Sequence, residues 1–144
     1  MDPLSIVASI GSLAGAAVKL ISTISEFIDV VQKAPSEVQA LNNELASLYS
    51  NLGHVKIAVQ APRHSVIPSE WIADFEKLAT DCDATLNDVQ VIVDKAKTTE
   101  VDGSARHMWK TVRFVFKAKQ VDLLKRRIAS QNGILQILLA VLTE

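Results

Sequence analysis

Apolar residues recur at intervals of three and four along most of this chain, which is the spacing of an amphipathic helix. After Pro35 this spacing predicts one helix on the apolar positions Val38, Leu41, Leu45, Leu48, Leu52, Val55 and Val59. A second helix, with Ser69 as its cap, is predicted on Trp71, Phe75, Leu78, Cys82, Leu86, Val89 and Val93. No stretch alternates between apolar and polar residues as a half-buried strand does, so the pattern predicts an all-α chain.

The last third of the chain predicts two helices, over about 105–116 and about 119–142. The longer one keeps its apolar spacing, but Gln131 occupies one expected core position. Proline and glycine lie at the breaks, so we expect one domain over 1–144, an all-α antiparallel bundle of four to five helices. Its core is expected to include Ile10, Leu13, Ile24, Leu41, Leu45, Leu48, Leu52, Leu124, Ile128 and Leu135.

The N-terminal helix is apolar on nearly all sides. It is predicted over about 3–33, opened by Asp2 and Pro3 and ended by Pro35. From Pro3 to Ser25 its only charged side chain is Lys19. Two interpretations stay open: it is the most buried helix of a soluble bundle, or it is a segment that can leave the bundle for a lipid bilayer.

Length and composition permit the second interpretation. A helix over 3–25 is about 34 Å long, and the hydrocarbon core of a bilayer is about 30 Å thick. Lys19 would cost about 2.5–3.5 kcal/mol at the membrane centre, but it lies off-centre and can snorkel. Gly11 and Gly15 form a small-xxx-small pair, which also occurs where soluble helices pack tightly. The residues expected to insert are Leu4, Ile6, Val7, Ile10, Gly11, Leu13, Gly15 and Val18.

Charge is distributed unevenly along the chain, although the net charge is only −1. The range 70–102 holds nine acidic and three basic residues, and the range 106–127 holds eight basic residues and one acidic residue. Either the two ranges form complementary solvated faces, or the basic one binds anionic lipid at about 1 kcal/mol per cation. The residues expected to bind lipid are Arg113, Lys117, Lys119, Arg126 and Arg127. Nucleic acid is not an expected partner, because the basic range lacks a recognisable binding motif.

Catalytic chemistry finds little support. Cys82 is the only cysteine and lies in phase with an apolar stripe, so a buried small hydrophobe is expected rather than a reactive thiol. Its neighbours Asp81 and Asp83 fall on different sides of the helix and form no acid–base pair. The three histidines are on different predicted elements: His54, His64 and His107. We therefore expect no enzyme activity, no cofactor and no metal site.

Three segments resemble fungal N-terminal helical domains of the HeLo-like type. These domains stand at the front of NLR-like (STAND) receptors and of companion cell-death proteins. The opening MDPLSIVASIGSLAGAAVKLI is similar to their start. The leucine-rich VQALNNELASLYSNL and the closing WKTVRFVFKAKQVDLLKRRIASQNGILQILL are similar to the same group, so the resemblance covers nearly the whole chain.

The resemblance implies a membrane-permeabilising effector of programmed cell death, as in heterokaryon incompatibility and innate immunity. It also implies that oligomerisation drives the N-terminal helix into the plasma membrane, so the expected partners are anionic phospholipid and further copies of the chain. By the same resemblance the domain is cytoplasmic at rest and at the plasma membrane when activated. The alternative is a soluble signalling adaptor that binds another helical domain. A further expectation is that the chain is the N-terminal part of a longer protein, because it stops at Glu144, straight after its last predicted helix.

Overall fold

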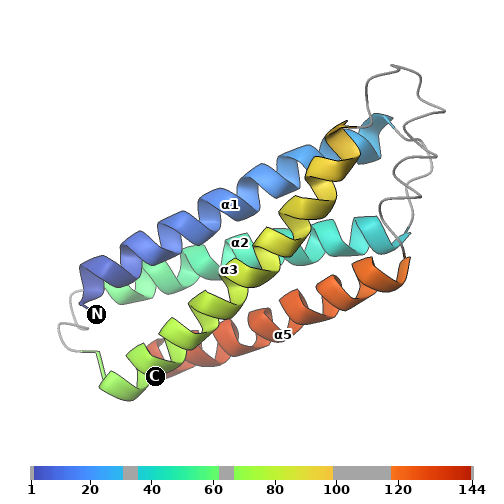
Figure 1. Cartoon of the computed structure of the whole chain (residues 1–144). Helices are drawn as coiled ribbons and strands as arrows, with labels where there is room; N and C mark the ends of the chain where they lie inside the picture. Colours follow the sequence, from blue (N-terminus) through green and yellow to red (C-terminus); the bar gives the residue numbers. More distant parts are fainter. Residues whose placement is uncertain (1, 31–35, 62–66, 99–117, 144) are drawn as a thin grey trace.

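The computed structural model describes residues 2–30, 36–61, 67–98 and 118–143. Within these ranges the chain forms four helices and no strand: α1 (Pro3–Val30), α2 (Ser36–Gln60), α3 (Ser69–Thr98) and α5 (Ala118–Thr143). The all-α prediction is therefore confirmed for these ranges (Figure 1). The shorter helix predicted over 105–116 and the end of the N-terminal helix predicted at about 33 lie outside the described residues.

The start of α1 follows the capping residue that the sequence indicates. The backbone N–H of Ser5 donates a 2.8 Å hydrogen bond to Asp2 Oδ1, which satisfies one of the free N–H groups in the first turn of α1. This hydrogen bond lowers the pKa of Asp2, because it stabilises the ionised carboxylate. Helix α3 starts at Ser69, close to the predicted start, but the carbonyl of Pro68 accepts the first hydrogen bond, from the backbone N–H of Ile72, so Pro68 rather than Ser69 is at the cap position.

Consecutive helices run in opposite directions, but the four helices are not arranged in chain order (Figure 1). The extensive contacts join α1 to α2, α2 to α5, α5 to α3 and α3 to α1. Around the bundle the order is therefore α1, α2, α5, α3. Helices α1 and α3 are neighbours that run in the same direction, and α2 and α5 form a second such pair.

The core is one cluster to which all four helices contribute. All ten core positions predicted from the sequence are buried, and Leu45 has no exposed surface. The seven predicted apolar positions of α2 and the seven of α3 are buried as well. The apolar spacing was therefore sufficient to identify the inward faces of these helices.

Buried and partly buried polar contacts join helices that lie far apart in sequence. Gln131 is buried, and its Nε2 donates a 2.8 Å hydrogen bond to Thr85 Oγ1 on α3. Asn132 Nδ2 donates to the carboxylate of Glu44 on α2, and Trp71 Nε1 donates to the backbone carbonyl of Leu138. Because a buried polar group without a partner is destabilising, these contacts favour one register of α5 against α2 and α3.

Candidate functional site

Helix α1 has an inner face that belongs to the core. The buried positions recur at intervals of three and four along its whole length: Ile6, Ile10, Leu13, Ala17, Leu20, Ile24 and Phe27. Val7, Ile21 and Ile28 are partly buried against the same cluster. At rest the helix is therefore held along its length rather than by one end.

Part of the outer face of α1 is made of small residues: Ala8, Gly11, Ser12 and Gly15 are exposed on it. A methyl group added at Gly11 or Gly15 would meet no other atom within 4 Å, so neither glycine is needed for close packing inside the described bundle. These glycines leave the backbone of α1 open to a neighbour from outside.

Helix α1 is long and apolar enough to cross a membrane. The candidate span is Pro3–Asp29, and its most apolar stretch has a mean hydropathy of 1.9. The core helix of a soluble protein or a signal sequence can be equally long and apolar, so length and composition alone do not separate these cases. About 28% of the residues in its most apolar stretch are buried, and the others are partly buried or exposed.

The eight residues predicted to insert do not share one face in the resting bundle. Leu4 is 82% exposed at the tip of α1, and Val18 is exposed near its middle. In contrast, Ile6, Ile10 and Leu13 belong to the core. Insertion of the predicted set would therefore require these three residues to leave the core.

The basic residues predicted to bind lipid are only partly described. Arg113 and Lys117 lie outside the described residues, whereas Lys119 and Arg126 are exposed on α5. Arg126 Nε lies 3.0 Å from Asp122 Oδ2 on the same helix. Arg127 Nη1 lies 2.7 Å from Asp88 Oδ2 on α3, so at this point the acidic and basic ranges do form complementary faces.

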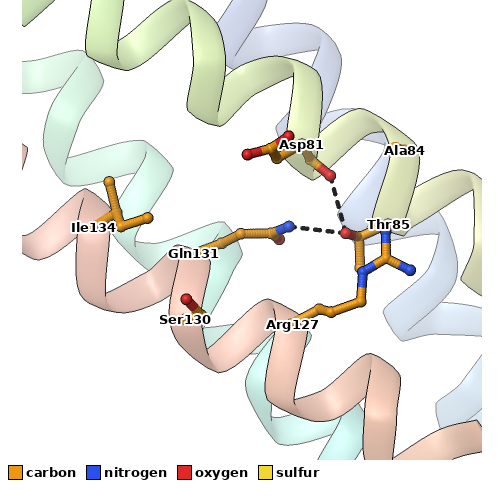
Figure 2. A pocket seen from close by; sticks show the side chains of 7 residues that line it. All are labelled: Asp81, Ala84, Thr85, Arg127, Ser130, Gln131 and Ile134. Atoms are coloured by element: carbon orange, nitrogen blue, oxygen red, sulfur yellow. Dashed lines mark hydrogen bonds between the residues drawn. The ribbon is translucent and has the colours of Figure 1, made fainter.

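Two surface grooves run between neighbouring helices. The α1–α3 groove is lined by Ser9, Ser12, Leu13, Glu76, Ala79, Thr80 and Asp83. The α3–α5 groove has a first hollow lined by Asp81, Ala84, Thr85, Arg127, Ser130, Gln131 and Ile134 (Figure 2). A second hollow continues it and is lined by Asp74, Lys77, Leu78, Asp81, Ile134, Ile137 and Leu138.

Cys82 is a buried thiol between these two grooves. Burial, with a smaller contribution from the charge of Asp81, raises its pKa to about 12, so the thiol stays protonated and unreactive near neutral pH. Asp81 and Asp83 open into different grooves, as the sequence predicted. Among the described residues no three His, Cys, Asp or Glu side chains are placed to hold a metal ion.

The α3–α5 groove was not identified from the sequence. Its signal was present in the apolar residues of α5 that fall outside the core spacing, namely Ile134, Ile137 and Val141, all of which are exposed. No family model, no curated protein and no solved structure matches this chain.

Proposed function

We propose that this domain permeabilises membranes as a regulated cell-death effector of the HeLo-like type, with α1 as the inserting segment. The observation that carries the proposal is that α1 is apolar on its inner face and nearly uncharged on its outer face. Its inner face is a core stripe, and its outer face has only small residues, Val18 and Lys19 through most of its length. Such a helix can exchange the interior of the bundle for the interior of a bilayer without burying a row of charges.

The energetics make release a regulated step. Six large side chains of α1 are buried, and exposing each to water costs about 1.5–3 kcal/mol, or about 9–18 kcal/mol together. This sum is as large as the whole stability of a typical domain, which is about 5–15 kcal/mol. Helix α1 therefore stays docked until lipid or further copies of the chain replace the lost contacts, which makes it a two-state element.

The basic residues of α5 would bring the domain to an anionic surface. Lys119 and Arg126 are exposed, and each cation near an anionic leaflet is worth about 1 kcal/mol. Arg126 and Arg127 contribute less to this attraction than Lys119, because Arg126 is already paired with Asp122 and Arg127 with Asp88. The proposal places the domain in the cytoplasm at rest and at the plasma membrane after activation.

Dye release from phosphatidylcholine vesicles, with and without phosphatidylserine, tests this function. We expect the wild type to release dye once it is oligomerised by a fused coiled coil, and to do so faster from the anionic vesicles. Leu4→Glu should slow release several-fold, because a charge at the leading tip must then cross the hydrocarbon core. Leu4 is largely exposed, so the bundle should unfold at the same temperature as the wild type.

Ile57→Glu is the matched control, because Ile57 is also exposed (70%) but lies on α2. This variant should release dye at the wild-type rate. If Leu4→Glu keeps full activity, α1 is not the inserting segment. If the oligomerised wild type releases no dye, the domain is instead a soluble signalling adaptor, a function that the exposed apolar residues of α5 favour.

A further inference from the structure

The α3–α5 groove consists of two adjoining hollows that share Asp81 and Ile134. Figure 2 shows the first of them, and together the two extend along α5 from Arg127 to Leu138. On α3 the lining residues extend from Asp74 to Thr85, which corresponds to about 17 Å of helix at 1.5 Å per residue. A groove of this length between two antiparallel helices matches about three turns of a third helix.

The α5 wall of the second hollow is apolar. Ile134 and Ile137 line it and Ile137 is 65% exposed, whereas Val141, one turn further along α5, is exposed but lines neither hollow. Their spacing of three and four residues places them in one row on α5, next to the inward-facing Leu138. A row of this kind is covered by the apolar face of an amphipathic helix that presents residues at positions i, i+3 and i+7.

The opposite wall is acidic. Asp74 and Asp81 are seven residues apart and so lie on the same side of α3, with the single base Lys77 between them. At the far end the charge of Arg127 is paired with Asp88, which lies 2.7 Å away. The groove between these points therefore carries an excess of negative charge next to its apolar wall.

The floor of the groove holds an unused hydrogen-bond acceptor. Gln131 is only 6% exposed, and its Nε2 donates to Thr85 Oγ1. The Thr85 hydroxyl in turn donates to the backbone carbonyl of Asp81, so it has no proton left for Gln131 (Figure 2). Gln131 Oε1 is buried and has no partner among the described residues. This oxygen has less than 1 Å² of accessible surface, so a donor from a partner reaches it only if the Gln131 side chain moves.

We propose that this groove binds a basic amphipathic helix of a partner protein. The apolar face of the partner helix covers Ile134, Ile137 and Val141. Its lysine or arginine side chains lie against Asp74 and Asp81. The carboxylates of Asp74 and Asp81, against the single base Lys77, favour a partner with lysine or arginine on its polar face. This interaction uses α3 and α5, so it does not depend on the membrane activity of α1.

Titration of the ¹⁵N-labelled chain with a synthetic helix tests the apolar part of the proposal. The probe is a peptide of leucine and lysine, about three to four turns long, with the leucines on one face. Its chemical-shift changes should lie along the two walls of the groove. Ile137→Asp should weaken its binding at least tenfold, whereas the matched control Ile57→Asp on α2 should leave binding unchanged.

Charge exchange tests the polar part. The double variant Asp74→Lys, Asp81→Lys should weaken binding of the leucine–lysine peptide. It should allow a leucine–glutamate peptide of the same pattern to bind. Lys77→Glu should raise the affinity for the leucine–lysine peptide several-fold, because it removes the one base from the acidic wall. Lys56→Glu, on the exposed side of α2, adds the same charge elsewhere and should change binding little.

Equal effects of Lys77→Glu and Lys56→Glu would overturn the proposal, because they would show non-specific attraction. So would chemical-shift changes confined to α1 and α2.

Sedimentation of the chain alone identifies a second copy as the occupant if a dimer forms and Ile137→Asp dissociates it. Vesicle binding that is lost in Ile137→Asp, without any peptide binding, would assign the row to a lipid surface. Thermal unfolding of each variant checks that the bundle is intact.

Discussion

Helices α1 and α3 lie side by side, run in the same direction and each contact two neighbours, yet their outer faces differ (Figure 1). Each contributes a row of buried residues to the one core. Outside that row, the 28 residues of α1 include three charged side chains, whereas the 30 residues of α3 include ten. The same inward packing is therefore combined with two very different outward surfaces.

This difference separates what determines the fold from what determines the function. The inner faces place both helices in the bundle, because burial of apolar surface is the main favourable contribution to folding. The outer face decides which other environment a helix can enter. A charged residue at the centre of a bilayer costs about 2.5–3.5 kcal/mol, so the ten charges of α3 oppose insertion far more strongly than the three charges of α1.

The largest expected effect is on the inner faces, where the two helices should behave alike. Ile10→Ala on α1 should lower the free energy of unfolding by about 2–5 kcal/mol, and Phe75→Ala on α3 by about 3–5 kcal/mol. Both side chains are fully buried, so each truncation loses apolar contacts and leaves a cavity. Urea denaturation measures both. A loss below about 1 kcal/mol for Ile10→Ala alone would mean that α1 is not an integral part of the core.

A smaller effect is expected on the outer face of α1. Gly11→Ala and Gly15→Ala should each raise the free energy of unfolding by about 0.4–1 kcal/mol, because the added methyl meets open space and restricts the unfolded chain. The same changes should reduce dye release if the glycines bring inserted helices together. Gly133→Ala on α5 is the matched control. It should stabilise the bundle equally and leave release unchanged, and a loss of release in this control would contradict a specific role for the glycines of α1.

The smallest expected effect is at the start of α1, where the cap titrates. The pKa of Asp2 lies below its ordinary value of 3.8, because Ser5 donates hydrogen bonds to the ionised carboxylate. The stabilisation of the first turn is therefore complete above pH 3.8 and is lost as the pH falls through the lowered value. The amide shift of Ser5, followed by NMR, should titrate with a midpoint below 3.8. In Asp2→Asn the side-chain oxygen should still cap the helix, but the Ser5 amide shift should not titrate. A midpoint at or above pH 3.8 in the wild type would contradict the cap.

Much of the fold was predictable, because apolar spacing reports which side of a helix faces inward. The seven positions of α2 from Val38 to Val59 follow that spacing without interruption, and all are buried. Even the interruption at Gln131 was visible in the sequence. The hydrogen bond that accommodates this polar residue was not visible, because its partner Thr85 is 46 residues away and only the packing of α3 on α5 brings the two together.

The candidate sites were less predictable, since they depend on which faces remain uncovered. An apolar α1 fits both a central helix and a surface helix, and only its place in the bundle shows that Leu4 and Val18 face outward while Ile6 faces the core. Arg127 was predicted to bind lipid, but its pairing with Asp88 depends on a contact between α5 and α3 that no local pattern encodes. The basic residues Arg113 and Lys117 lie outside the described residues, so their role stays a prediction.

A reversible tether between α1 and α3 tests the central claim most directly. Ser12 and Thr80 line the same groove, so Ser12→Cys and Thr80→Cys can be joined by a reducible thiol cross-linker. The native thiol will not react, because burial raises the pKa of Cys82 to about 12. A second tether, between Lys77→Cys and Ile137→Cys, joins α3 to α5 and leaves α1 free. We expect the α1–α3 tether to abolish dye release, reduction to restore it, and the α3–α5 tether to leave it unchanged. Full release with α1 still tethered would contradict the account, because the helix would then never have left the bundle.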